Sequence, residues 1–422
     1  MVAKSLLALF LVAGCASAPR PEPPVREITY WEALARLESG KATASARTVA
    51  ERDFASALQS LMLGDVAKAE QGFDALRRTA TDSVIRSGSR VMHIATLQYQ
   101  EKWMELAELA RDTARPHASN PDKAAIELWA LAFSNLPPRT AEFRARLERV
   151  PMSVSSVGTP LIPVQIGSRE YHFWLDTGSS MTMLASDVAE SLGVTPLVGD
   201  TLEIVTSTGR IVAQPALIPE LRLGQLIVRN VAGMIVDETM MRMREPKQLG
   251  RGPQLKIDGI IGFDIIRRLD IEVDYLDGTI RLRDPARSSQ PRERNMFWVG
   301  LPVVQLRSPG GMPLHFALDT GSQLTFVTET LLYKLQLQAT RMESRRVGGL
   351  GGEVSMRAPV LSSLRLTLRG FPILFRNAVV RAPVYQVLAA LDGVLGGDIW
   401  STGAVRIDVT NGVFAVRRPA RH

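Results

Sequence analysis

The second half of the chain contains one unit twice, and this internal duplication restricts the possible folds more than any other feature. Residues 172–179 (HFWLDTGS) recur as residues 315–322 (HFALDTGS), 143 positions later. Residues 258–264 recur as residues 392–398, 134 positions later. Both copies consist of short β-forming runs bounded by turn residues. Because the segments follow in the same order, the sequence predicts two similar all-β lobes related by a pseudo-twofold axis.

Each copy carries the tripeptide Asp-Thr-Gly directly after an apolar strand, with the aspartates at Asp176 and Asp319. A carboxylate that ends a buried strand is rigid and partly desolvated. Two such groups brought together at the axis cannot both ionise cheaply, so they share one proton. The pair could hold a water, remove its proton as it attacks a peptide carbonyl, and protonate the carbonyl oxygen. We therefore predict that Asp176 and Asp319 are the catalytic residues.

The alternative explanation of one Asp-Thr-Gly tripeptide is a β-turn capped by aspartate. Two copies in register favour the catalytic interpretation. Gly178 and Gly321 would let the chain turn tightly beside the carboxylates.

The motif set resembles the pepsin and retropepsin superfamily of aspartic peptidases, and more closely the bacterial retropepsin-like group with both lobes in one chain. The resemblance covers about residues 151–416 and includes an apolar-apolar-Gly element after each turn, at 260–262 and 394–396. It implies an aspartic endopeptidase that hydrolyses protein or peptide substrates of the cell envelope without a metal or cofactor. It also implies supporting roles: the threonines interlock across the axis and the serines hydrogen-bond the aspartates. The supporting residues are Thr177, Gly178, Ser179, Thr320, Gly321 and Ser322.

Two glycine-containing hairpins, 206–211 and 348–354, lie at matching distances after the aspartates. Hairpins of this kind can close over an extended peptide and bond to its backbone. We predict two flaps, as in retropepsin dimers, whereas pepsins have one. The expected flap and substrate-binding residues are Ser207, Thr208, Gly209, Arg210, Gly349, Leu350, Gly351, Gly352 and Glu353.

Residues 27–150 are rich in Ala, Leu, Glu and Arg, and their apolar residues recur at helical spacing. The region divides into five to seven predicted helices, with breaks at Gly40, Gly64, 87–88, Pro116, Pro121 and 137–138. Residues 63–69 and 99–106 lie about one tetratricopeptide period apart, so a tetratricopeptide-like array and a plain helical bundle are both open. An array would offer a concave surface to a protein partner.

The first residues are predicted to be a targeting sequence. Lys4 precedes a short apolar stretch, 6–13, that is typical of a secretory signal peptide and too short to span a bilayer. Cys15 occupies the position of the lipidated cysteine in the bacterial lipobox that this segment resembles. By resemblance to envelope sorting signals, Ala16 favours the outer membrane. We expect a periplasm-facing lipoprotein held by a lipid anchor; the alternative is an ordinary signal peptide cleaved after Ala16 or Ala18.

These features predict a multidomain α plus β chain with an N-terminal helical domain and two retropepsin-like lobes. The expected divisions are a lipoprotein signal peptide (1–14), a Pro-rich tether (15–26), the helical domain (27–150), the first lobe (151–285), a linker (286–296) and the second lobe (297–422).

Three other features receive structural interpretations. The repeated histidines His172 and His315 share a strand face with the aspartates, but the family that the chain resembles uses no histidine in its chemistry. The alternating acids of 270–274 are interpreted as a solvated strand face rather than a calcium site. The insertion 237–256 in the first copy is interpreted as an exposed loop.

Charge and composition exclude other classes. The net charge of +7 is spread without a run of like charges, which argues against nucleic-acid binding. One cysteine excludes an intrachain disulfide and a thiolate zinc cluster, and five histidines without HxxxH spacing argue against a metal site. Two alternatives stay open: a catalytically silent peptide-binding or assembly lipoprotein built on the same lobes, and a dyad formed between two chains.

Overall fold

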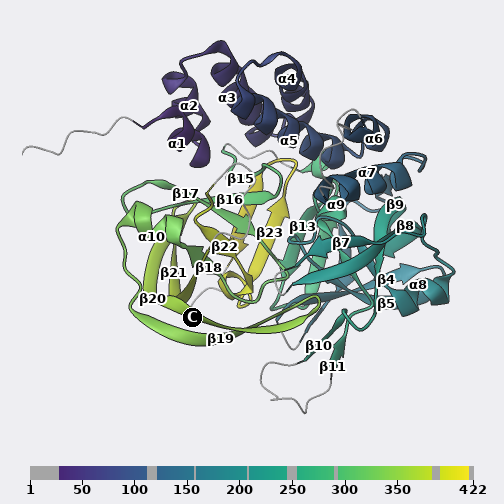
Figure 1. The fold of residues 1–422 in the computed structure, drawn as a ribbon. Coiled ribbons are helices and arrows are strands. Elements are labelled where there is room, and N and C mark those ends of the chain that lie inside the picture. Colours follow the sequence, from purple (N-terminus) through teal and green to yellow (C-terminus); the bar gives the residue numbers. More distant parts are fainter. Residues whose placement is uncertain are drawn as a thin grey trace, which may run out of the picture.

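The computed structural model describes residues 28–111, 121–155, 158–206, 209–244, 254–288, 293–382 and 390–417. In these segments a helical region precedes two β-rich lobes (Figure 1), which confirms the predicted order of helical and β structure. No helix in them is long and apolar enough to cross a membrane. The signal peptide, Cys15 and the Pro-rich tether lie outside the described residues.

The helical region starts at Tyr30, and its helices begin where the sequence places capping side chains. Thr29 and Thr48 form capping boxes with the glutamates three residues later, and Asp82 accepts two backbone N–H groups at the start of its helix. The described helices are α1 (Tyr30–Ala35), α2 (Ser39–Ser45), α3 (Val49–Met62), α4 (Val66–Thr79), α5 (Ser83–Gln100), α6 (Trp103–Arg111) and α7 (Pro121–Phe133).

The last helix of this region ends at Phe133, inside the range 27–150 that was predicted as helical. Pro137 and Pro138 follow, and neither can continue an α-helix. Beyond them, β1 (Thr140–Glu142) pairs with β9 of the first lobe, and β2 (Glu148–Pro151) pairs with β14. The final stretch of the predicted helical range therefore contributes edge strands.

The first lobe is built on a sheet with the strand order β1-β9-β6-β12-β5-β4-β8-β7, and β3 pairs with β4. Its remaining strands are β3 (Ser153–Val154), β4 (Pro160–Ile166), β5 (Arg169–Leu175), β6 (Met183–Ala185), β7 (Leu202–Val205), β8 (Arg210–Leu223), β9 (Leu226–Val236) and β12 (Gly259–Ile261). Two short helices, α8 (Ser186–Leu192) and α9 (Phe263–Ile266), and a separate hairpin of β10 (Arg242–Arg244) and β11 (Gln254–Lys256) complete it.

The second lobe has the order β15-β16-β17-β22-β18-β21-β20-β19. The strands are β15 (Met296–Trp298), β16 (Pro302–Arg307), β17 (Pro313–Leu318), β18 (Phe326–Thr328), β19 (Arg341–Gly349), β20 (Gly352–Leu368), β21 (Phe371–Arg381) and β22 (Gly393–Leu395). Helix α10 (Glu329–Leu335) follows β18, as α8 follows β6 in the first lobe. The 3-10 turn η2 (Gly397–Ile399) follows β22, and another, η1 (Pro285–Arg287), precedes β15 in the sequence.

A third sheet joins the lobes, with the order β2-β14-β13-β23-β24. Its edge strands are β2 and β24 (Val413–Arg417), and β14 (Thr279–Arg283) lies between β2 and β13. At its centre, β13 (Asp270–Asp274) and β23 (Ala404–Asp408), which occupy corresponding positions in the two copies, pair antiparallel with Glu272 opposite Arg406. The lobes of one chain therefore share continuous backbone hydrogen bonding.

The acids of β13 do not form a solvated face, so that interpretation is wrong. Asp270 and Asp274 are buried, and Glu272 is mostly covered. Arg406 makes a bidentate contact with Asp270, while Arg281 contacts both Glu272 and Asp274. Because the arginines reach across from neighbouring strands of the shared sheet, the acids are neutralised by ion pairs between strands.

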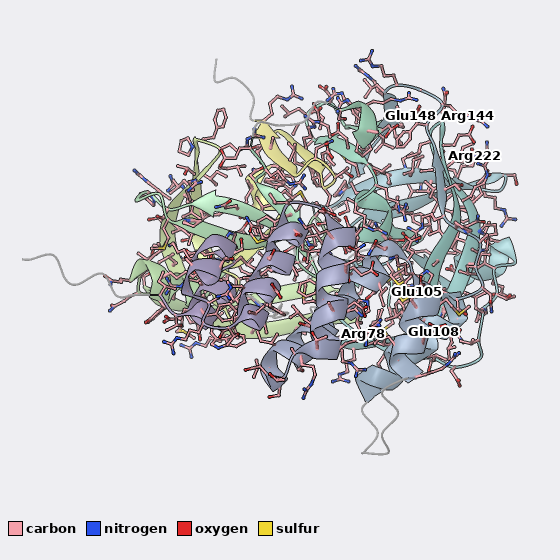
Figure 2. The ribbon with its side chains drawn as sticks, turned by 90° about the horizontal axis from the view of Figure 1, so that it is seen from above. Arg78, Glu105, Glu108, Arg144, Glu148 and Arg222 are labelled. Atoms are coloured by element: carbon pink, nitrogen blue, oxygen red, sulfur yellow. The ribbon has the colours of Figure 1, made fainter. Side chains whose placement is uncertain are left out.

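The helical region packs on both lobes. Near the C-terminal end of α5, the ring of Tyr99 lies 4.3 Å from that of Trp298 in the second lobe, and the guanidinium of Arg267 in the first lobe lies 4.2 Å from the Tyr99 ring centre. At the other end of the region, Ala390 N donates to Ala35 O over 3.0 Å. From above (Figure 2), the helices extend across the lobes, with Glu105 and Glu108 of α6 labelled.

Candidate active site

Both Asp-Thr-Gly turns are held by the apolar-apolar-Gly elements that follow them in sequence. β12 runs parallel to β5, and Asp176 N donates to Ile261 O over 3.0 Å. In the second lobe β22 runs parallel to β17, and Asp319 N donates to Leu395 O over 3.1 Å. Each aspartate thus follows directly after a buried central strand, and that strand is hydrogen-bonded to a neighbouring strand on each side.

The two turns bind each other through their threonines. Thr177 N donates to Thr320 Oγ1 (2.9 Å), and Thr320 N donates to Thr177 Oγ1 (3.0 Å). The hydroxyls in turn donate across the interface to Leu318 O (2.8 Å) and Leu175 O (2.7 Å). Both threonines are buried, so water cannot reach their N–H and hydroxyl groups, and these four bonds satisfy those groups instead. The interlocked threonines expected from the resemblance are present in the structure.

The structure brings Asp176 and Asp319 into direct contact. A side-chain hydrogen bond joins the two carboxyl groups. The glycines leave the necessary space: a Cβ placed on Gly178 would lie 2.8 Å from Asp319 Cγ, and one on Gly321 would lie 2.7 Å from Asp176 Cγ. Each glycine therefore faces the aspartate of the other lobe.

The electrostatics of this pair differ from those of ordinary carboxylates. Burial raises the pKa of both Asp176 and Asp319, and the negative charge of Asp176 raises the pKa of Asp319 further. The backbone N–H groups of Gly178 and Gly321 donate to the aspartate of their own turn and partly offset the increase. The pair therefore keeps a proton at a pH where isolated carboxyl groups have lost theirs.

The serines bond the aspartates through their backbone and not through their hydroxyls. Ser322 N donates to Asp319 Oδ1 (3.0 Å), and the backbone of Ser179 bonds Asp176. The two hydroxyls donate to the carbonyls of Met181 and Leu324, two residues further on. They therefore shape the turns, while the N–H groups stabilise the charged carboxylates.

Sequence reasoning missed two further threonines that support the turns. Thr182 Oγ1 donates to the buried Asp264 (2.9 Å) and accepts from Gly262 N; Thr325 Oγ1 donates to Asp398 (2.7 Å) and accepts from Gly396 N. A signal for them exists, because Thr182 and Thr325 are separated by the same 143 positions as the aspartates. In the first lobe, Arg139 Nη1 also pairs with Asp264 at 2.6 Å.

The two hairpins that were predicted to be flaps are β7–β8 and β19–β20, and they contact each other. Thr206 Oγ1 of the first hairpin donates to Leu350 O at the tip of the second over 2.9 Å. Gly349 pairs with Gly352 across the tip, which leaves Leu350 and Gly351 as its turn residues. Gly209 N donates to Thr206 Oγ1, and Arg210 pairs with Glu203 on the protein surface. Ser207 and Thr208 lie outside the described residues, and only the backbone of Gly352 and Glu353 is described.

The described part of the insertion 237–256 is largely exposed, but it also makes contacts that its interpretation as an exposed loop does not include. Met241 is fully buried, and Met240 O accepts a hydrogen bond from Gly351 N (3.2 Å) at the tip of the second flap. The insertion therefore holds the flap of the opposite lobe. Periodicity gave no signal for this contact because its partners are more than 100 residues apart.

The repeated histidines take no part in the carboxyl pair. His172 is exposed, whereas His315 is buried, and burial lowers the pKa of His315 to about 3. Their backbone N–H groups donate to Asp258 and Asp392, the first residues of the repeated segment. Among the residues that the structure describes, no group of three His, Cys, Asp or Glu could hold a metal ion.

The chain was also compared with known protein families, curated proteins and solved structures. Residues 162–265 and 304–399 match a family model described as aspartyl protease, one match in each lobe. A crystal structure of aspartic proteinase from Irpex lacteus aligns over 63% of this chain and 95% of its own, with 14% identity and a TM-score of 0.39. No curated protein matches the chain. Both β-rich lobes are thus similar to the aspartyl protease family, and Asp176 lies in the first matched range and Asp319 in the second.

Proposed function

We propose that this protein is an aspartic endopeptidase whose dyad, Asp176 and Asp319, lies at a pseudo-twofold axis between the lobes. The observation that carries the proposal is the direct contact of two carboxyl groups whose pKa values are raised. At the pH where the pair holds one proton, its ionised member can deprotonate a water and its protonated member can donate to the carbonyl oxygen of the peptide bond. Water adds to the carbonyl carbon, and the C–N bond then breaks as the amine leaves with a proton.

The flaps would close over an extended peptide. The β19–β20 tip would move with β7–β8 because Thr206 joins the two hairpins. Such closure excludes water and positions the bond to be cleaved beside the dyad.

The direct test is isosteric replacement of each acid. Asp176→Asn and Asp319→Asn should each lower kcat on unfolded casein by about 10³-fold or more, because neither variant can both accept and donate the required proton. Asp200→Asn, an exposed aspartate outside the site, is the matched control and should keep full activity. Full activity in either dyad variant would refute the mechanism. Peptide binding without cleavage by the wild type would instead favour the silent binding protein.

We further propose that the protein is a periplasm-facing lipoprotein of the bacterial outer membrane, acting on envelope proteins. The support is the sequence around Cys15. Metabolic labelling with a radioactive fatty acid should mark the wild type and not Cys15→Ser, and the label should fractionate with the outer membrane. Equal labelling of both would overturn the anchor. A tetratricopeptide-like array and a protein partner for the helical region stay predictions.

A further inference from the structure

A cavity of about 380 Å³ opens beside the carboxyl pair and has walls from three parts of the chain. Gly178 and Asp319 line it at the dyad, and Trp298 and Ala317 line it from the second lobe. The remaining walls include Tyr99 at the end of α5 and Phe263 at the start of α9. Concave, mostly apolar spaces with a few polar groups are the usual form of ligand sites.

The helical wall of this cavity is firmly attached to the lobes. Tyr99 is fixed between Trp298 and Arg267, 4.3 Å and 4.2 Å away, and Ala95 lines the cavity one turn earlier in α5. Because these contacts reach both lobes, the end of α5 keeps its position relative to the dyad.

Glu101 fastens this corner. It ends α5 with φ +60°, a left-handed conformation that a non-glycine residue adopts at a cost. Its Oε1 lies 3.0 Å from Arg267 Nη2, 3.1 Å from Arg268 Nη2 and 3.5 Å from Arg139 Nε. Glu101 therefore lies close to three guanidinium groups, and one of them, that of Arg139, also pairs with Asp264. The rest of the wall is dominated by aromatic and aliphatic side chains.

The duplication explains why there is space here. The repeat position two residues before the aspartate holds Trp174 in the first copy and Ala317 in the second. Both side chains are buried, but Ala317 lines the cavity and Trp174 does not. The smaller side chain leaves volume beside Asp319 that the end of α5 closes from the outside.

We propose that the end of α5 is part of the substrate-binding site, where Ala95 and Tyr99 form the outer wall of a pocket for a large apolar or aromatic side chain next to the cleaved bond. The proposal rests on the proposed function and deepens it: the helical region determines specificity and does not merely space the lobes. A pocket of this kind discriminates by roughly 10–200-fold per methylene-sized change in fit.

The test compares kcat/KM on two peptides that differ only by Phe or Ala beside the cleavage site, on the side that wild-type products identify. Ala95→Leu fills the pocket and Tyr99→Ala removes its wall, so each should reduce the Phe-to-Ala preference about tenfold or more. Tyr99→Phe should retain the preference. Val91→Leu, an exposed position on the same helix, is the control and should leave it unchanged. A purely structural role for α5 would lower both rates alike and leave the ratio constant, which would overturn the proposal.

A binding measurement separates this proposal from the proposed function. In the Asp176→Asn background, the Phe peptide should change the fluorescence of the tryptophans around the cavity at lower concentration than the Ala peptide, and adding Ala95→Leu should abolish the difference. Cleavage by the wild type with an unaltered Phe-to-Ala ratio in both pocket variants refutes the pocket alone. Selective binding that depends on Ala95, without cleavage by the wild type, refutes the peptidase and retains the pocket.

Discussion

Gly178 and Gly321 determine how closely the two acids can approach. Each occupies the space in which a side chain would meet the opposite carboxyl group, at 2.8 Å and 2.7 Å respectively. Such distances are shorter than real Cβ contacts, so a larger residue must displace the acid. The geometry of the dyad therefore depends on two residues that take no part in proton transfer.

Gly178→Ala should lower kcat about 100-fold, because a displacement of about 1 Å at a reacting group has a cost of this size. Gly199→Ala is the matched control, since nothing lies within 4 Å of the Cβ that it adds. Steady-state kinetics with a folded-state check by circular dichroism would measure both. Normal activity of folded Gly178→Ala would show that catalysis does not depend on this close contact between the acids.

The raised pKa values of Asp176 and Asp319 predict the pH dependence. Activity requires one shared proton, so it should persist above the ordinary aspartate pKa of about 3.9 and fall as the pair loses that proton. The measurement is kcat/KM as a function of pH. If kcat/KM has already been lost by pH 5 as the pH rises, this expectation is wrong.

The same shift has a consequence for stability. A carboxyl group whose pKa is raised by folding contributes stability that is complete below the unfolded pKa and is lost as pH rises through the folded pKa. Asp319→Asn should therefore raise Tm relative to the wild type at pH 8 and not at pH 3.

At the scale of elements, the shared sheet joins the lobes through charged residues as well as through its backbone. Arg406 on β23 contacts Asp270 on β13 at 2.8 Å and 3.0 Å, and Asp270 is fully buried. Removal of one partner from a buried pair leaves an uncompensated charge, whose cost exceeds the net value of the pair itself.

Arg406→Met should lower the free energy of unfolding by about 3 kcal/mol, because it leaves Asp270 without its bidentate partner. Denaturant unfolding would measure the change. Arg144→Met, which breaks an exposed pair with Glu142, is the control and should leave the midpoint unchanged. Equal midpoints for both variants would show that the lobes do not depend on this contact.

The sequence predicted the elements that repeat and missed the contacts between different elements. The Asp-Thr-Gly turns and the hairpins were found because each copy supports the other. The buried state of Asp270 was missed, because alternation alone cannot distinguish a solvated face from one covered by arginines of neighbouring strands. The contact of Met240 with Gly351 and that of Tyr99 with Trp298 join segments without common periodicity, so only the tertiary structure shows them.

At the scale of the whole molecule, one chain supplies both halves of the candidate site. β13 and β23 pair directly, and the threonines bond across the interface. The helical region adds contacts with both lobes (Figure 1). Within the described residues, the carboxyl pair therefore forms without a second copy.

Mixing purified Asp176→Asn and Asp319→Asn chains should not restore cleavage, because each chain closes its own site with one acid missing. The rate of casein cleavage by the mixture would be measured, with the rate of each variant alone as the baseline. Recovery of about a quarter of the wild-type rate, the fraction expected for random exchange of lobes, would establish a site built between chains.

The position of β23 has a consequence for the time at which the acids can meet. β23 begins more than 220 residues after Asp176, yet it lies inside the shared sheet next to β13. During translation, Asp176 is synthesised long before β23, the strand that pairs with β13. The sheet that joins the lobes therefore cannot be completed until residues 404–408 have been synthesised, so the order of translation sets the earliest moment at which the two carboxyl groups can be held together.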